Sequence, residues 1–471
     1  MTATESTPRL ALVTGASGYV GGKVVERLLD QGWRVRALVR HASSYEPPSD
    51  EVEIAEGDAQ TYDDVLTALD GVDVAWYLLH SMDAGGDFQG RDKEMADTFA
   101  AAAAKAGVSR IVYLGGLHPD GEPLSHHLAS RVEVGRILLD SGVPTAAVQA
   151  GVVLGDGSAS FDMLAGLAER LPGAVAPRWV ENHIQPIAVD DVVHYLVAAA
   201  DLPPQENRTF DVGGPDVLTY GEMMQRYAGV MGMGPRPLLV APVATPRLAA
   251  YWMGLVTPVD STMATPLIES VLHDTVVKER DLDDLVGAPE GGVAGFDEAV
   301  RDANRDREPW RPVRLLGATA AATTATAVLG VIATTPGSLW FKTLRKPAWQ
   351  PPNATFGPVW TFLYADIAVI SALHVADAAD KGDTAEVRRF SAALAANLML
   401  NAAWSWVFFR GKNLPAATAV AVGLAASSAD LVRRVGQRRE RGVALAPYAA
   451  WTGFAAALSA TLWRKNPHRS R

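Results

Sequence analysis

The chain begins with short apolar runs that alternate with amphipathic stretches. "LALVTG", which starts at Leu10, is followed by a glycine-rich turn, an amphipathic segment that ends near Gly32, and a second apolar run, "WRVRALVR". Short apolar runs bounded by turns predict buried strands, and the segment between them has helical spacing. "EIAEGDAQTYDDVLTALDGVDVAWYLLH" repeats the order as strand, helix and strand. This pattern predicts an α/β doubly wound parallel sheet.

A different pattern begins near Leu315, where apolar stretches of about twenty residues recur with short loops between them. The five stretches are Leu315–Thr335, Phe356–Ala376, Phe390–Phe409, Leu414–Val432 and Val443–Leu462. A helix of this length crosses the hydrocarbon core of a bilayer, so an all-α bundle of transmembrane helices is predicted. The first and fourth stretches are rich in alanine, which leaves open that some are buried helices of a soluble domain. Regular spacing and tryptophans at the ends of the stretches favour the membrane.

Two segments lie between these patterns. Residues 215–286 are predicted to form a substrate-side lobe of the first domain. Within them, Leu238–Val259 is nearly as apolar as a membrane span, but three prolines and Arg247 interrupt it. A buried helix of a substrate pocket is favoured over insertion, and a peripheral membrane contact stays open. Residues 290–314 have the composition of a polar linker. The predicted domains are 1–309 and 310–471.

Charge is divided between the two parts. Residues from Trp310 onward carry 19 Lys and Arg against 7 Asp and Glu, and the preceding part carries 23 against 46. An acidic first domain argues against nucleic acid as a partner, and cations beside long apolar runs suit the cytoplasmic edge of a bilayer. The chain has no cysteine, and no metal site is predicted. The N-terminus lacks the pattern of a signal peptide, so the first domain is expected in the cytoplasm of an integral, multi-pass membrane protein.

The first turn carries the strongest chemical signal. Gly15, Gly18 and Gly21 are spaced G-x-x-G-x-x-G between a strand and a helix. Small residues let the main chain approach a pyrophosphate, and free N–H groups at the helix start bind it. A tight turn without a ligand is the alternative interpretation. The predicted cofactor-binding residues of the turn are Gly15, Ser17, Gly18, Tyr19, Val20 and Gly21.

Two further residues are predicted to contact the nucleotide. Arg40 follows the second strand, at the position where enzymes that prefer NAD usually carry an acid for the ribose hydroxyls. A guanidinium suits a 2′-phosphate, so NADP(H) is predicted in preference to NAD(H). The alternative is that Arg40 only solvates a loop. Asp58, after the third strand, is placed to meet the adenine edge.

From Arg9 to about Glu308 the chain resembles the short-chain dehydrogenase/reductase superfamily, in its atypical, NmrA-like or extended branch, with a Rossmann-type fold. "IVYLGGL", "QPIAVDDVVHYLV" and "FDVGGPDVLTYGEMM" agree with it. The resemblance implies a catalytic serine and a Tyr-x-x-x-Lys, and both are missing here. Gly115 and Gly116 stand where the serine is expected, and the next helix offers His127 and Arg131 instead. His127 and Arg131 are a candidate acid-base pair, with a non-catalytic helix start as the alternative.

"WFKTLRKPAWQPPNATFGPVWTFLY", "ANLMLNAAWSWVFF" and "PYAAWTGFAAALSATLWRKN" resemble the TspO/MBR family of tryptophan-rich sensory and translocator proteins. The resemblance covers Leu315 to Asn466 and implies a cavity for a planar apolar ligand such as a porphyrin or a sterol-like molecule. The ligand-binding residues it implies are Trp349, Trp360, Asn401, Trp404, Tyr448 and Trp451.

Several features of this second domain leave alternatives open. Prolines stiffen the loop before the second span, which is expected to act as a lid over the bundle. The asparagines are instead expected to join helices if no ligand binds there. Ser459 replaces a customary asparagine, and Asn397 replaces a common glutamine. Asp366 is an ionisable residue within the second span whose role is left open. The resemblance also implies homodimers through the membrane domain.

Three functions are consistent with this organisation. The first is a redox or tetrapyrrole sensor in which cofactor and bundle ligand influence each other. The second is a membrane-attached NAD(P)H-dependent oxidoreductase that acts on an apolar substrate. The third is a transporter of tetrapyrrole-like molecules with a regulatory nucleotide-binding domain. The missing Tyr-x-x-x-Lys favours the sensor.

Overall fold

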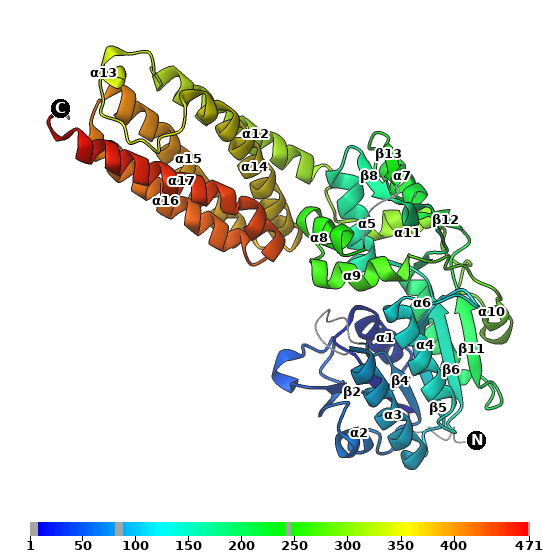
Figure 1. Ribbon diagram of the computed structural model, residues 1–471. Coiled ribbons are helices and arrows are strands. Elements are labelled where there is room, and N and C mark those ends of the chain that lie inside the picture. Colours follow the sequence, from blue (N-terminus) through cyan, green and yellow to red (C-terminus); the bar gives the residue numbers. More distant parts are fainter. Residues whose placement is uncertain (1–7, 81–87, 242–245, 470–471) are drawn as a thin grey trace. The chain divides into compact units, whose positions relative to one another are not determined.

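The computed structural model describes residues 8–80, 88–241 and 246–469. The chain divides into two compact units, which Figure 1 shows coloured along the sequence. The N-terminal unit comprises Met1–Met253 and Val259–Asp306, and the C-terminal unit comprises Gly254–Pro258 and Arg307–Arg471. The chain therefore passes from one unit to the other within helix α8 (Pro246–Val256), as well as after Pro258 and Asp306.

Within the described residues, a parallel sheet of seven strands forms the centre of the N-terminal unit. The strand order is β11-β6-β5-β4-β1-β2-β3, which reverses direction between β1 and β4. The register places Leu12 between Arg36 and Ala75. The strands are β1 (Leu10–Thr14), β2 (Arg34–Val39), β3 (Glu53–Glu56), β4 (Val74–Tyr77), β5 (Arg110–Gly116), β6 (Thr145–Ala150) and β11 (Arg208–Val212). The predicted doubly wound α/β fold is confirmed.

Two hydrophobic cores cover the two faces of this sheet. Alternate residues of a strand point to opposite faces, so Ala11 and Val13 enter one core while Leu10 and Leu12 enter the other. This explains why β1 is apolar at every position. The first core contains helices α1 (Tyr19–Asp30) and α6 (Val189–Ala198). The second contains α2 (Tyr62–Ala68), α3 (Phe88–Ala106) and α4 (His126–Leu139).

A third core forms the second lobe of the N-terminal unit, and the predicted 215–286 region lies within its span from Leu154 to Ala303. Its helices are α5 (Ala159–Arg170), α7 (Tyr220–Val230), α9 (Ser261–Ser270), α11 (Phe296–Ala303) and part of α8. The paired short strands around it are β7 (Val153–Leu154) with β10 (Ile187–Ala188), β9 (His183–Ile184) with β12 (Leu218–Thr219), and β8 (Ala174–Pro177) with β13 (Leu238–Ala241). The remaining helix is α10 (Asp281–Val286), and 3₁₀ turns occur at Ala42–Ser44, Arg178–Glu181, Ala199–Asp201 and Pro467–Arg469.

Two sequence-based expectations for this lobe are wrong. Leu238–Val259 is not one buried helix: it contains strand β13 and helix α8, and Tyr251 and Trp252 of α8 are exposed. Pro246 is the first residue of α8, a position that suits the fixed φ of proline. The expected linker contains α11, whose Phe296, Ala299, Val300 and Ala303 are buried.

The C-terminal unit contains, among the described residues, five helices long and apolar enough to cross a membrane. They are α12 (Arg311–Ala333), α14 (Asn353–Asp380), α15 (Thr384–Ser405), which continues as a π-helix over Trp406–Arg410, α16 (Leu414–Val435) and α17 (Arg439–Lys465). The predicted five-helix membrane bundle is confirmed, although most helices extend beyond the predicted spans. A short helix, α13 (Leu339–Lys342), lies in the connection between α12 and α14.

Polar contacts join the alanine-rich first helix to the bundle. The buried residues of α12 include Thr319, Thr323 and Thr326, which share one face at i, i+4 and i+7. Thr319 Oγ1 donates to the Ala368 carbonyl of α14 at 2.8 Å. Small residues let helix backbones approach closely in a membrane, and α12 is rich in alanine.

Candidate functional site

The glycine turn lies at the carboxyl end of β1, beside the point where the strand order reverses. In open α/β sheets this point is the usual ligand site. Gly15 has a φ of 72°, and a Cβ there would lie 2.6 Å from the Leu78 carbonyl oxygen. A Cβ at Gly21 would lie 2.1 Å from the Gly15 oxygen. Both positions therefore require glycine, and the turn exposes main chain where a phosphate group would approach.

The start of helix α1 completes this cradle. Gly18 is the N-cap and has no side chain to bind the first N–H groups of the helix. The N–H groups of Tyr19, Val20 and Gly21 lack intrahelical acceptors by helix geometry, and the helix dipole adds positive potential there. Ser17 and Gly18 are exposed beside them. The predicted turn residues are thus brought together, and they fit a dinucleotide pyrophosphate.

The side chain of Tyr19 is directed to the loop that follows β7. A Cβ at Gly155 would lie 2.2 Å from the Tyr19 hydroxyl oxygen, so the ring and this loop are in close contact. Burial raises the pKa of Tyr19 above its usual value, and the nearby Asp156 raises it further. The phenol is therefore neutral, and Tyr19 can offer a cofactor its N–H group.

Arg40 and Asp58 lie at the same edge of the sheet as the glycine turn, because they follow the neighbouring strands β2 and β3. Arg40 is exposed, and its guanidinium forms no ion pair within the described residues. Arg36, by contrast, pairs with Glu53 at 3.0 Å. Asp58 is exposed, and its Oδ1 accepts from the Gln60 N–H at 3.0 Å, so it also stabilises the turn after β3.

His127 and Arg131 lie on the first two turns of α4. Arg131 donates to the Leu114 carbonyl, and its guanidinium carbon lies 5.8 Å from the centre of the Tyr113 ring. Arg131 is thus held against the carboxyl end of β5. The His127 ring centre lies 6.4 Å from that of His80. Burial, with a contribution from Arg131, lowers the pKa of His127 to about 3. The imidazole is therefore neutral at pH 7 and is a weak base.

Side chains of α4 pack against the strand end where the catalytic serine was expected. A Cβ at Gly116 would lie 3.3 Å from a methyl group of Leu128 and 3.8 Å from Arg131 Cδ, so α4 packs closely on this strand end. Tyr113 is buried, and its hydroxyl donates to the Arg131 carbonyl at 3.0 Å. This tyrosine is committed to the packing of α4 on β5.

Sequence reasoning did not identify two residues next to His127. The N–H of His127 donates to Glu269 Oε2 of α9 at 3.3 Å, and the His80 ring lies close to the His127 ring. His80 stands three residues after a buried strand, and this position at a carboxyl strand end was a usable signal. Glu269 gave no signal, because only the tertiary fold brings α9 to the start of α4.

In the C-terminal unit, buried amides and tyrosines form one hydrogen-bond network. Tyr364 Oη donates to Asn401 Oδ1 at 2.8 Å, and Asn401 Nδ2 donates to Tyr448 Oη at 3.4 Å. Tyr448 Oη in turn donates to Asn397 Oδ1 at 2.6 Å. Asn397 Nδ2 reaches Ser428 Oγ at 3.1 Å. The network links α14, α15, α16 and α17, so both asparagines join helices, as the alternative interpretation expected.

The predicted aromatic residues fall into separate groups. The ring centre of Trp360 lies 5.4 Å from Tyr364 and 6.5 Å from Tyr448, beside the amide network. Trp404 stacks on Phe408 at 5.1 Å, and its indole N–H donates to Ser459 Oγ at 3.1 Å. Ser459, the departure from the family pattern, therefore has a structural partner.

The other two tryptophans meet at Phe454 of α17. The ring centres of Trp349 and Trp451 lie 5.6 Å and 5.2 Å from that of Phe454. Trp349 precedes α14 and is 49% exposed. Asp366 belongs to neither group, and its Oδ2 is buried without a hydrogen-bond partner. The structure assigns Asp366 no role.

Comparisons with known proteins agree with both units. Residues 318–464 match the TspO/MBR family, and residues 15–146 match a family described as NAD(P)H-binding. The chain is 33% identical over 136 residues to the translocator protein of Sus scrofa. The matched segment covers 28% of this chain and 78% of that protein. It is 34% identical over 134 residues to the tryptophan-rich protein TspO of Chlorobaculum tepidum, covering 28% and 82%.

The N-terminal unit has relatives of its own. The chain is 29% identical over 232 residues to a (4-alkanoyl-5-oxo-2,5-dihydrofuran-3-yl)methyl phosphate reductase of Streptomyces griseus, covering 49% of this chain and 75% of that protein. The fold is similar to that of the triphenylmethane reductase of Citrobacter sp. complexed with NADP(H), with a TM-score of 0.50 and 19% identity. That likeness covers 63% of this chain and 99% of the other.

Proposed function

Because the chain belongs to the TspO/MBR family through its C-terminal helices and carries an NAD(P)H-binding domain before them, we propose that it is a membrane-anchored redox or tetrapyrrole sensor. In this function, nicotinamide cofactor at the glycine turn and a planar apolar ligand in the helix bundle influence each other's binding. The bundle binds the bilayer, and it forms homodimers in the membrane.

The environment of the candidate acid-base pair, His127 and Arg131, carries this proposal. Gly115 and Gly116 occupy the expected serine position, and α4 has no tyrosine. His127, the candidate replacement, is neutral with a pKa of about 3, and Arg131 is held by a main-chain carbonyl. A general acid is most effective when its pKa lies near the working pH, which His127 does not satisfy. Cofactor binding without turnover is consistent with this set of groups.

The cofactor proposed is NADP(H) rather than NAD(H). Arg40 is exposed and, within the described part of the chain, forms no ion pair; it lies at the same sheet edge as the glycine turn, where a guanidinium can bind the 2′-phosphate by charge-assisted hydrogen bonds. Asp58, on the neighbouring strand end, is proposed to meet the adenine.

The proposed bundle ligand is a porphyrin or a sterol-like molecule. Trp360 and Tyr448 offer ring faces beside the polar atoms of Asn401. Trp349 and Trp451 add ring faces at Phe454, while Trp404 lies on Phe408. Flat rings with a few fixed polar groups suit a planar apolar molecule.

A second candidate function is supported by the Streptomyces griseus relative, which is a reductase. Reduction of a neutral conjugated acceptor would require a hydride, which bound NADPH would supply, and a proton, which water could provide. Such a reaction does not depend on a strong side-chain acid. A membrane-attached NAD(P)H-dependent oxidoreductase of an apolar substrate is therefore the alternative.

Cofactor oxidation separates the two functions. Purified full-length protein in nanodiscs is mixed with NADPH and, in turn, a panel of porphyrins, sterols and quinones, while absorbance at the nicotinamide band is followed. The sensor proposal expects binding without steady NADPH consumption. Sustained oxidation that depends on one compound and is lost in Gly15→Val, which blocks the cofactor turn, would establish the oxidoreductase instead.

A further inference from the structure

Helix α8 ends on arginine side chains of the membrane unit. Its last residues and the following turn, Gly254–Pro258, belong to the C-terminal unit. Arg441 Nε donates to the Leu255 carbonyl at 3.2 Å and Arg441 Nη2 to the Thr257 carbonyl at 3.3 Å. Arg438 donates to the Thr257 and Pro258 carbonyls. The last carbonyls of a helix lack intrahelical donors and carry negative potential, so guanidinium groups cap α8 effectively.

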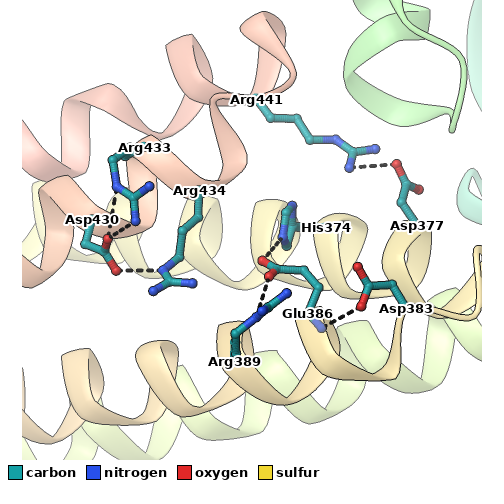
Figure 2. Close-up of polar contacts among 9 residues, drawn as sticks. All are labelled: His374, Asp377, Asp383, Glu386, Arg389, Asp430, Arg433, Arg434 and Arg441. Carbon is teal, nitrogen blue, oxygen red and sulfur yellow. Dashed lines mark hydrogen bonds and ion pairs between the residues drawn. The ribbon is translucent and has the colours of Figure 1, made fainter. Parts of the chain in front are cut away.

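A buried ion pair fixes these arginines. Arg441 Nη1 lies 2.8 Å from Asp377 Oδ2 of α14, and Arg438 Nε lies 3.5 Å from the same oxygen. Figure 2 shows Asp377 and Arg441 pointing toward each other from their two helices. The side chains of Arg441 and Asp377 are only 1% and 8% exposed. The end of α8 is thus held by the ends of two membrane-spanning helices.

This end of the bundle has the composition of a membrane boundary. Here α14 ends and α15 begins, and Glu386 pairs with His374 at 3.3 Å and with Arg389 at 3.3 Å (Figure 2). The Asp377–Arg441 ion pair joins this end to the connection where α16 ends and α17 begins, which carries Arg433, Arg434, Arg438, Arg439 and Arg441. Arginines at the ends of spans lie at the depth of the lipid headgroups, where they attract anionic lipids.

Tyr251 and Trp252 stand on the exposed side of α8. Tyr251 is 39% exposed and Trp252 is 42% exposed, whereas Ala250 and Met253 are buried. At about 1.5 Å per residue, Trp252 lies roughly 5 Å along the helix axis from Leu255. Tyrosine and tryptophan are enriched at membrane interfaces, because each has an apolar ring and a polar atom.

We propose that α8 is an interfacial helix whose Tyr251 and Trp252 enter the headgroup region of an anionic bilayer. The same helix includes Ala250 and Met253, which belong to the core of the substrate-side lobe. This proposal does not depend on the identity of the cofactor or the bundle ligand.

Site-directed spin labelling tests the proposal, and the absence of native cysteine lets one introduced cysteine be labelled selectively. Full-length Trp252→Cys is labelled with a nitroxide in nanodiscs of phosphatidylcholine and phosphatidylglycerol. Accessibility to oxygen and to a water-soluble nickel chelate is then measured. Tyr62→Cys on α2 is the matched water-exposed control at 40% native exposure, and Phe362→Cys on α14 is the lipid-facing control at 64%.

The expected result is a chelate accessibility at residue 252 several-fold below that at residue 62, with oxygen accessibility between the two controls. Equal chelate accessibility at 252 and 62 would overturn the proposal, because both labels would then be in water. Low accessibility to both reagents at 252 would also overturn it, since protein rather than lipid would cover the helix. Tyr251→Cys gives the same test if Trp252→Cys does not fold.

Discussion

At the scale of single residues, Arg40 differs from the two arginines that precede it on the same strand. Arg34 and Arg36 both pair with Glu53, while Arg40 lies beyond the strand end and forms no ion pair within the described residues. The N–H groups of a paired guanidinium are occupied by a carboxylate, whereas those of an unpaired guanidinium can donate to the oxygens of a phosphate. The preference for NADPH over NADH can therefore be tested by changing Arg40 alone.

Arg40→Ala is expected to weaken NADPH binding about tenfold to a hundredfold, because hydrogen bonds to a charged group contribute roughly 1.5–3 kcal/mol. NADH affinity should stay the same, since NADH has no 2′-phosphate. Calorimetric titration of both cofactors into the full-length protein measures the effect, with Arg34→Ala as the control on the same strand. Unchanged NADPH affinity in Arg40→Ala would remove Arg40 from the cofactor site.

The depressed pKa of His127 predicts a pH-dependent stability. Its folded pKa is about 3 and its ordinary value is 6.5, so between these values the unfolded chain binds more protons than the folded chain. The stability of the N-terminal unit is therefore expected to rise with pH over this window and to be lost as pH falls below 6.5. His127→Gln, which cannot be protonated there, should reduce the dependence, while His80, whose pKa burial also lowers to about 3, retains its share.

Thermal unfolding of the full-length protein between pH 5 and 7.5 measures this effect. His126→Gln is the neighbouring control, because His126 is exposed. If His127→Gln retains the full pH dependence of the parent, then the lowered pKa of the partly buried His127 is wrong. The case for a sensor without a catalytic acid would weaken with it.

At the scale of elements, the sequence predicted what local periodicity determines. The glycine spacing predicted a tight turn between strand and helix, and Gly15 and Gly21 are required there by main-chain contacts within that turn and with Leu78. The sequence-based prediction was wrong for α11, which was expected to be a linker because its residues are mostly polar. Its few apolar residues recur at helical spacing and are buried: Phe296, Ala299, Val300 and Ala303. The neutral state of His127 was also beyond the sequence, since tertiary burial and Arg131 produce it.

The contacts of Asn401 and Trp349 distinguish two roles that the sequence could not: joining helices and contacting a ligand. Asn401 bonds to Tyr364 and Tyr448, so Asn401→Ala removes contacts that join three helices. Polar contacts between membrane helices contribute about 0.6–1.7 kcal/mol each. Trp349 precedes α14, contacts Phe454 and is half exposed. Its ring is available to a ligand without being needed for helix packing.

Trp349→Ala is therefore expected to weaken porphyrin binding several-fold with little change in thermal stability, because ring stacking contributes about 0.5–1.5 kcal/mol. Asn401→Ala should lower both. Porphyrin titration by tryptophan quenching in nanodiscs, with thermal unfolding of each variant, gives the two readouts. Trp463→Ala, an exposed tryptophan at the end of α17, is the control. Parent-like binding by Trp349→Ala would make Trp349 an interfacial anchor rather than part of a lid.

At the scale of the whole molecule, five spans after a cofactor-binding domain predict a topology. Cofactor in the cytoplasm requires the N-terminal unit there, which places the end of α17 on the opposite side. Because the native chain lacks cysteine, His468→Cys can be labelled selectively by a membrane-impermeant maleimide in intact cells. Strong labelling is expected, whereas Lys381→Cys, between α14 and α15, should react only after lysis. Protection of residue 468 before lysis would indicate an even number of spans.

The sensor function predicts that cofactor affinity and porphyrin affinity are coupled in the full-length protein. If cofactor and porphyrin each shift the same conformational equilibrium, then NADPH must change porphyrin affinity by the same factor by which porphyrin changes NADPH affinity. Coupling free energies of this kind commonly correspond to factors of about 5 to 150. Arg40→Ala should then suppress the effect of NADPH on porphyrin binding at cofactor concentrations that saturate only the parent. Titrations in both directions on full-length protein in nanodiscs decide the matter. A factor of one in both directions would mean that one chain carries two independent binding units, and sensing would have to be abandoned in favour of separate functions.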